Sequence, residues 1–274
     1  MTEVLRPLTL GELLDRTISL YRRHALVFSG LIAIPALLSV SARIVQTTYL
    51  SRNPDLDLTR VLILIAGFFV FIIASMIATS ISQAATMVAV SQVHLGRPVS
   101  IAESFAALRG RLIRLCFITV SLGILLICTI FLFILPVFYF ALRWSLAVPA
   151  AVLENRGLGQ SMDRSATLVE GQYGRIFMIY LLYFVLMMIL SSAVQTPLVI
   201  VALMRGADLM ALPLWLSLAG DIASFFVHVL VGPLLTIAIA LAYYDARVRK
   251  EAFDLQHMLA QLEPAGTGQP VLTS

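Results

Sequence analysis

The chain has 274 residues, of which 60% are hydrophobic and only 12% are charged. A typical soluble domain has about 45–50% apolar and about 25% charged residues, so this composition excludes both a soluble globular protein and intrinsic disorder. The net charge of +4 comes almost entirely from arginine, and no basic stripe on a folded domain points to a nucleic-acid partner. The composition therefore predicts an all-α integral membrane protein, surrounded by membrane lipids.

Apolar stretches long enough to cross a hydrocarbon core of about 30 Å predict six membrane spans. They cover residues 25–46, 61–93, 112–135, 137–153, 176–203 and 214–243. Pro136 divides the long stretch 112–153, because proline lacks an amide proton and clashes with the preceding turn. Residues 1–256 are expected to form one membrane domain, and residues 257–274, which are rich in glycine and proline, a flexible cytoplasmic tail. A cleaved signal peptide is the alternative for the first span, but the acidic residues that precede that span disfavour it.

The distribution of basic residues predicts the orientation of the chain in the cell's inner (plasma) membrane. If both termini are cytoplasmic, fourteen of the 19 basic residues lie in cytoplasmic segments. The opposite side then holds four, namely Arg43, Arg52, Arg60 and Arg205. Because basic residues concentrate on the cytoplasmic side of membrane proteins, we expect both termini to be cytoplasmic.

Three segments on the cytoplasmic side of the spans follow a common plan. Thr9-x-x-Glu12, Ser100-x-x-Glu103 and Gly157-x-x-Gln160 each precede apolar residues at helical spacing. The first two are capping boxes, in which a hydroxyl and a carboxylate satisfy free amides at a helix start. The pattern predicts three amphipathic helices on the cytoplasmic side, each followed by two spans, in a pseudo-threefold arrangement.

Asp15-Arg16 in the first of these helices aligns with Asp163-Arg164 in the third. The helices can be structural collars lying in the headgroup layer. Alternatively, these four residues form a docking or gating surface for a protein partner at the cytoplasmic face, or the arginines capture lipid headgroups.

Three long motifs resemble the membrane domain found with bacterial glycerophosphoryl diester phosphodiesterases. They are Arg6-Pro7-Leu8-Thr9-Leu10-Gly11-Glu12-Leu13-Leu14-Asp15-Arg16, then Arg143-Trp144-Ser145-Leu146-Ala147-Val148-Pro149 with its continuation to Gly171, and Tyr243-Tyr244-Asp245-Ala246-Arg247-Val248-Arg249 with its continuation to Asp254. The resemblance spans roughly residues 6–255. It implies no reaction for this chain, because the phosphodiesterase activity of that family resides in a separate barrel domain. The segments outside the spans are too short for such a barrel.

Ionisable residues inside spans are candidates for function because they are costly to place there. Arg143 and Asp221 each lie seven residues into a span from the outer side, so they are expected at equal depth as an ion pair. Snorkelling to the surface and a substrate or ion site are the alternatives. His228 follows Asp221 by two helical turns, either packed in the bundle or acting in a proton relay.

The sequence contains none of the motifs that commonly accompany catalysis. We find no nucleophile elbow, no zinc-protease motif and no phosphate-binding glycine loop, and the two cysteines do not suggest a metal site. We therefore expect no cofactor, no metal and no enzymatic activity. A non-enzymatic scaffold or helper at the cytoplasmic face is the first interpretation. A small transporter or lipid-handling protein, with a polar site at Arg143, Asp221 and His228, is the alternative.

Overall fold

The computed structural model describes residues 8–52, 57–132, 134–206 and 213–262, and every regular element within these ranges is a helix. The helices are α1 (Leu10–Arg23), α2 (Ala25–Arg52), α3 (Leu58–His94), α4 (Ile101–Ala106), α5 (Leu112–Leu132), α6 (Ile134–Arg143), α7 (Ala147–Leu153), α8 (Leu158–Val169), α9 (Tyr173–Met204) and α10 (Leu214–Leu262). The predicted all-α class is confirmed.

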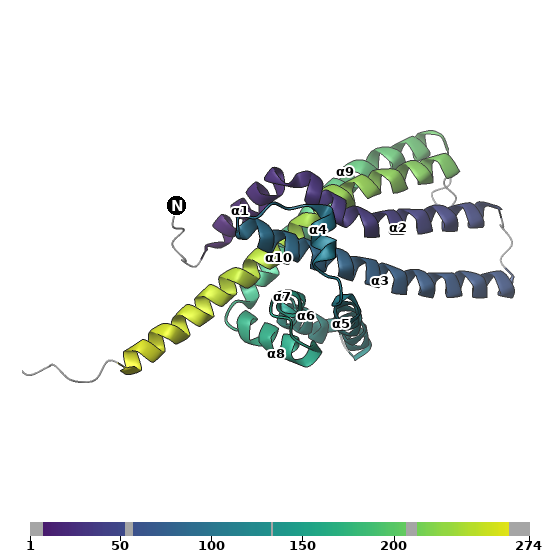
Figure 1. Cartoon of the computed structure of the whole chain (residues 1–274). Helices are drawn as coiled ribbons and strands as arrows, with labels where there is room; N and C mark the ends of the chain where they lie inside the picture. Colours follow the sequence, from purple (N-terminus) through teal and green to yellow (C-terminus); the bar gives the residue numbers. More distant parts are fainter. Residues whose placement is uncertain (1–7, 53–56, 133, 207–212, 263–274) are drawn as a thin grey trace, which may run out of the picture.

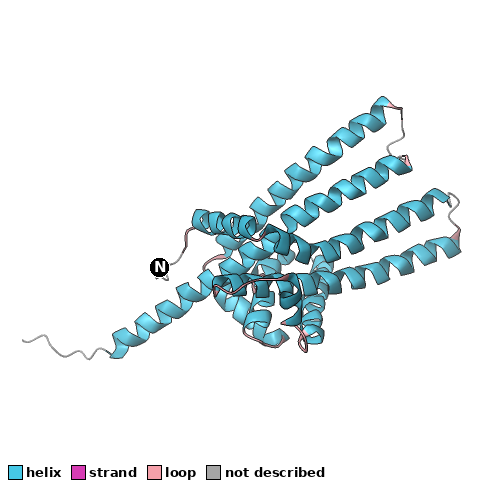
Figure 2. Ribbon diagram, turned by 45° about the horizontal axis from the view of Figure 1, so that its top comes forward, coloured by secondary structure: helices cyan, strands magenta, loops and turns pink. Residues whose placement is uncertain are grey.

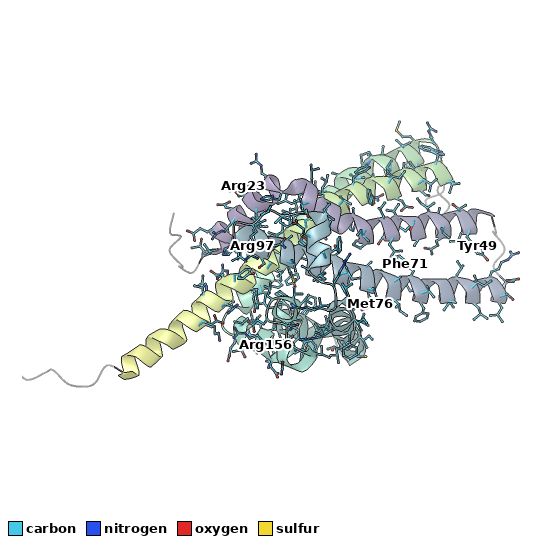
Figure 3. The ribbon with its side chains drawn as sticks, viewed as in Figure 1. Arg23, Tyr49, Phe71, Met76, Arg97 and Arg156 are labelled. Atoms are coloured by element: carbon cyan, nitrogen blue, oxygen red, sulfur yellow. The ribbon has the colours of Figure 1, made fainter. Side chains whose placement is uncertain are left out.

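The four longest helices form two hairpins, α2 with α3 and α9 with α10, which diverge toward one end of the molecule (Figure 2). We call this the loop end, because α2 and α9 end there and α3 and α10 begin there. The shorter helices gather at the opposite end, around α10 and the last turns of α3 (Figure 1). We call that the collar end, and we call α1, α4 and α8 the collar helices. Arg23, Arg97 and Arg156 lie at the collar end, whereas Tyr49 and Phe71 lie along the α2–α3 hairpin (Figure 3).

Five segments of the described chain are long and apolar enough to cross a membrane. They are Ala25–Leu50, Leu58–His94, Pro136–Leu153, Tyr173–Met204 and Leu214–Glu251. The remaining predicted span, 112–135, corresponds to α5, whose apolar stretch Leu112–Leu126 is shorter. The predicted fourth span, 137–153, is not one helix, because a turn at residues 144–146 separates α6 from α7.

The contacts between helices follow a cyclic order of three units, α1–α3, α4–α7 and α8–α10. Each collar helix packs against the end of the preceding unit: α4 on α3, α8 on α7, and α1 on α10. The first long helix of each unit also contacts the preceding unit, in the pairs α5 with α3, α9 with α6, and α2 with α10. This is the order that the predicted pseudo-threefold arrangement requires.

The collar helices begin at the predicted residues. The Thr9 hydroxyl accepts from the Glu12 amide at 3.3 Å and the Glu12 carboxylate accepts from the Thr9 amide at 2.8 Å, which completes the capping box. The Ser100 hydroxyl accepts from the Glu103 amide at 3.1 Å, whereas Gly157 begins α8 without a side-chain cap. The fourth and eighth residues after the cap are buried in all three segments, as Leu13 and Thr17, Ser104 and Leu108, and Ser161 and Ser165; Leu108 lies in the turn that follows α4.

A serine compensates for the proline inside α2. Pro35 has no amide proton, so the carbonyl of Leu31 one turn earlier lacks its helical partner. The Ser82 hydroxyl of α3 donates to that carbonyl at 2.6 Å in a buried position. The hydrogen bond joins α2 to α3 at the turn of α2 where proline removes a backbone hydrogen bond.

The last helix is longer than the sequence suggested. The tail was predicted to begin at residue 257, but α10 continues to Leu262, and residues 263–274 of the predicted tail lie outside the described residues. Two ion pairs at i,i+4 spacing, Arg247–Glu251 and Asp245–Arg249, stabilise the helix where it continues beyond the predicted span.

Candidate functional site

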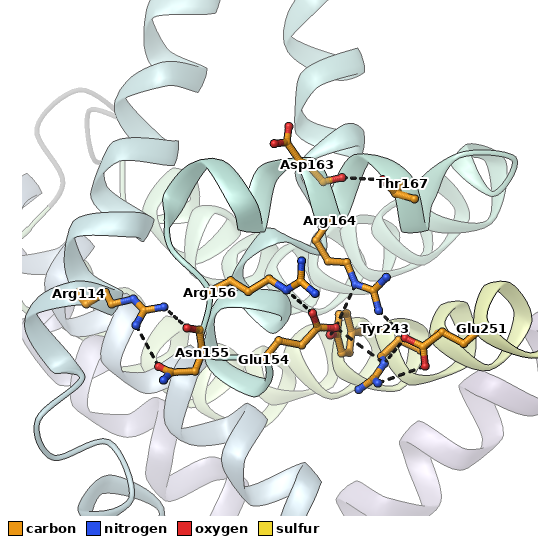
Figure 4. Close-up of polar contacts among 10 residues, drawn as sticks. Arg114, Glu154, Asn155, Arg156, Asp163, Arg164, Thr167, Tyr243 and Glu251 are labelled. Atoms are coloured by element: carbon orange, nitrogen blue, oxygen red, sulfur yellow. Dashed lines mark hydrogen bonds and ion pairs between the residues drawn. The ribbon is translucent and has the colours of Figure 1, made fainter. Parts of the chain in front are cut away.

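A carboxylate network joins three helices at the collar end, with Glu154 at its centre (Figure 4). Glu154 directly follows α7, and its Oε1 accepts from the Tyr243 hydroxyl of α10 and from Arg164 Nε of α8 at 3.1 Å. Its Oε2 lies 2.5 Å from Arg156 Nε, in the segment between α7 and α8. Arg164 also donates from Nη2 to Glu251 of α10 at 2.5 Å. The Glu154 network therefore holds α7, α8 and α10 together.

The network extends in two directions. On α10, Arg247 Nε donates to Glu251 at 3.0 Å, an i,i+4 pair on one face of the helix. On the other side, Arg114 of α5 donates to the Asn155 side chain at 3.1 Å and to the Asn155 backbone carbonyl. Asn155 has a φ of 56°, a left-handed conformation that asparagine tolerates better than most residues.

Opposing influences act on the pKa of Glu154. Burial alone would raise it, but hydrogen bonds from Tyr243 and Arg164, together with the charges of Arg164 and Arg156, lower it below its ordinary value. The folded protein therefore favours the ionised carboxylate, which stabilises the packing of α8.

A second cluster, the Asp245 clamp, fixes the start of the chain to α10. The Asp245 side chain is only 1% exposed, and its Oδ1 accepts from the Leu8 amide at 2.6 Å. Its Oδ2 accepts from Arg249 Nε at 2.7 Å and from Arg175 at the start of α9. Arg249 also donates to the Leu8 carbonyl. The clamp joins segments more than 200 residues apart, since Leu8 and Asp245 are separated by 237 positions.

Ser165 bridges the turn between α6 and α7. Its hydroxyl donates to the Arg143 carbonyl at 2.7 Å and accepts from the Leu146 amide at 3.1 Å. Both backbone groups lose their helical partners where α6 ends, and Ser165 is fully buried. The Ser165 hydroxyl of α8 thereby supplies hydrogen-bond partners to the backbone on both sides of the turn.

The predicted surface residues separate into two kinds. Asp15 and Asp163 are exposed, whereas Arg16 and Arg164 are half-buried. Arg164 belongs to the Glu154 network, while the Asp163 side chain points away from it (Figure 4). Of these four predicted surface residues, only Asp15 and Asp163 are exposed.

The predicted pairing of Arg143 with Asp221 is wrong. Arg143 Nη1 donates to the Tyr139 hydroxyl at 2.7 Å, and Tyr139 stacks on Tyr173, the first residue of α9. Asp221 instead lies 3.7 Å from Arg43 of α2. The neighbouring Gly220 packs on Leu198, twenty-five residues or about 37 Å further along α9. The depth expected for Arg143 assumed that Pro136 lies at the outer surface, but α6 packs near the start of α9, at the collar end.

His228 is not packed inside the bundle, which was the first of its two interpretations. Its side chain is exposed, and Nδ1 lies 2.9 Å from the Ser224 carbonyl one turn earlier.

Sequence reasoning missed the centres of both clusters, Glu154 and the Asp245–Arg175 pair. The i,i+4 spacing of Asp245 and Arg249 is a local signal, but nothing local indicates partners that are 70 or more positions away. Among the described residues, no group of three or more histidine, cysteine or acidic side chains gathers that could hold a metal ion.

A comparison with known protein families identifies the family of this chain. No curated protein and no solved structure is detectably similar to it. One family model, the membrane domain of glycerophosphoryl diester phosphodiesterase, matches residues 113–255, which include α6 to α9, the Glu154 network and the Asp245–Arg175 pair. The resembling motif at Arg6–Arg16 lies outside the matched residues. Since the match covers just over half of the chain, the protein belongs to the family of glycerophosphoryl diester phosphodiesterase membrane domains.

Proposed function

We propose that this integral membrane protein is a non-catalytic scaffold that holds a protein partner at its collar end. The observation that carries the proposal is the exposure of Asp15 and Asp163 at equivalent positions of α1 and α8. Both helices are braced from behind, α1 through the Asp245 clamp and α8 through the Glu154 network. Charges on a rigid support lose little entropy when they bind a partner.

The surface of α1 offers the partner a defined place. Asp15, Ile18, Ser19, Arg22 and Arg23 line an open hollow of about 420 Å³. Ile18 is 50% exposed, so the hollow combines an apolar contact with charges of both signs. These features suit a short peptide segment that carries an acidic and a basic side chain around an apolar one.

The collar end is proposed to face the cytoplasm in the inner membrane. Basic side chains such as Arg23, Arg97 and Arg156 gather at this end (Figure 3), and basic residues favour the cytoplasmic side. Membrane lipids are the second proposed partner, because α3 exposes large apolar side chains such as Phe68 and Phe69 along its first half.

A stabilising role for the buried carboxylates supports a function without catalysis. Each oxygen of Glu154 and Asp245 faces an arginine, a tyrosine hydroxyl or a backbone amide. Such carboxylates stabilise helix contacts and are not free to accept a proton from a substrate. A second candidate function, a small transporter or lipid-handling protein, draws support only from Asp221 and His228, since Arg143 lies near the opposite end of α9.

Site-specific photocrosslinking in cells tests the proposal. A photoreactive residue in place of Ser19 is expected to capture a specific protein, and Asp15→Lys is expected to abolish that capture. The matched control carries the photoreactive residue in place of Leu58 at the loop end, which is 75% exposed. Capture from both positions, or capture that Asp15→Lys does not affect, would contradict a charge-directed docking surface.

A further inference from the structure

A row of polar side chains lies between α2, α9 and α10, in the half of the molecule nearer the loop end. Arg43 Nη1 of α2 lies 3.7 Å from Asp221 Oδ1 of α10. Gln195 Nε2 of α9 donates to the Ser224 hydroxyl of α10 at 3.0 Å, and His228 Nδ1 contacts the Ser224 carbonyl. We call these five residues the polar seam.

The polar seam follows the contacts of α10 with its neighbours and avoids the apolar outer face of α10. His228 and Gly232 follow Asp221 by seven and eleven residues. At 100° per residue, all three therefore share one side of the helix to within about 40°. This side faces α2, because Asp221 contacts Arg43 and a Cβ added at Gly232 would lie 3.0 Å from Ile32.

The adjacent side of α10 faces α9. A Cβ added at Gly220 would lie 3.5 Å from the Gln195 side chain, and Ser224 bonds to the same glutamine. The outer face of α10 is different in chemistry, since Ile222, Phe226 and Leu230 are 50%, 57% and 56% exposed.

The polar seam reaches deep into the apolar part of the molecule. His228 lies fourteen residues after Leu214, which is about 21 Å along the helix, in a hydrocarbon layer of about 30 Å. The side chains of Gln195 and His228 are nevertheless exposed, and that of Arg43 is 72% exposed. His228 Nε2 bonds to no residue that the structure describes. Hydrocarbon cannot satisfy such groups, because an unpaired polar atom in lipid costs several kcal/mol.

We propose that the polar seam is a water-filled crevice that opens at the loop end, and that its ligand is water. Water supplies the hydrogen bonds that the exposed guanidinium, amide and imidazole lack. Arg43–Asp221 is the contact of the polar seam nearest the start of α10, which lies at the loop end.

Cysteine accessibility in lipid nanodiscs tests the crevice independently of orientation. In a Cys116→Ala, Cys128→Ala background, the single variants Ser224→Cys, His228→Cys and Phe226→Cys are treated with a charged methanethiosulfonate. Ser224→Cys and His228→Cys are expected to react at least about tenfold faster, because a thiol ionises and reacts in water but not in hydrocarbon. Phe226→Cys is the matched control at similar depth on the outer face of α10. Equal, slow reaction at all three positions would overturn the proposal.

Spontaneous disulfide formation between two copies at Ser224→Cys would also overturn it, since a second copy would then cover the polar seam. Ser224→Cys keeps the size of the native side chain, so the test holds even where His228→Cys does not insert.

Discussion

Replacing Asp245 by asparagine tests whether the Asp245 clamp stabilises the fold. The variant keeps the shape of the side chain and removes its charge, which leaves Arg175 without a counterion. The Arg175 side chain is 14% exposed, and its Nε and Nη2 have no hydrogen-bond partner even in the native arrangement. Breaking a buried ion pair on one side costs about 3–5 kcal/mol, because the remaining charge stays desolvated. Arg249 adds less, since its side chain is 35% exposed and can turn to water.

We therefore expect Asp245→Asn to lower the free energy of unfolding by about 3–5 kcal/mol, measured by reversible unfolding in mixed detergent–SDS micelles. Limited proteolysis is expected to cut the chain near Leu8 sooner, since the clamp no longer holds that backbone. Glu170→Gln is the matched control, because the Glu170 side chain is 75% exposed and lies 3.7 Å from Lys250. The reasoning fails if Asp245→Asn is as stable as this control. Adding Arg175→Gln to Asp245→Asn is expected to recover part of the loss, because no uncompensated charge then remains buried.

Three further predictions concern other contacts. Ser165→Ala is expected to cost about 1–3 kcal/mol in the same unfolding assay, since two buried backbone groups lose their partner, whereas exposed Thr167→Ala has little effect; equal costs would contradict the bridging role. Because the pKa of Glu154 is lowered in the fold, ionised Glu154 stabilises the protein above the ordinary carboxyl pKa of 4.5 and stops doing so as the pH falls through its folded value. Unfolding measured against pH is therefore expected to show a shallower acid loss in Glu154→Gln, and an unchanged slope would argue against this. Finally, Arg143→Gln and Asp221→Asn are expected to have additive effects on stability, because the two residues lie near opposite ends of α9; a charge swap that restores stability would show that they do pair.

The helix starts could be predicted because capping is local. Thr9, Ser100 and Gly157 each reveal a start through residues within one turn, and all three collar helices begin directly after them. The all-α class followed equally directly from the apolar stretches, since a membrane leaves the backbone few other ways to satisfy its hydrogen bonds.

The long-range partners could not be predicted from local patterns. Glu154 and Tyr243 are 89 positions apart, and their contact depends on how α7 and α10 pack. Arg143 was misplaced for a related reason. The depth of α6 depends on its packing near the start of α9, where Tyr139 stacks on Tyr173, and the local sequence gives no sign of that contact.

The cyclic order of the three units has a consequence for how the chain is made. Helix α1 emerges from the ribosome before α10, on which it packs, and 237 positions separate Leu8 from its partner Asp245. During that interval the apolar side of α1, including the fully buried Leu13, lacks its contacts with α10. An amphipathic helix suits that wait, because it rests in the headgroup layer until its partner arrives. Closure of the ring can then occur only after α10 has been inserted.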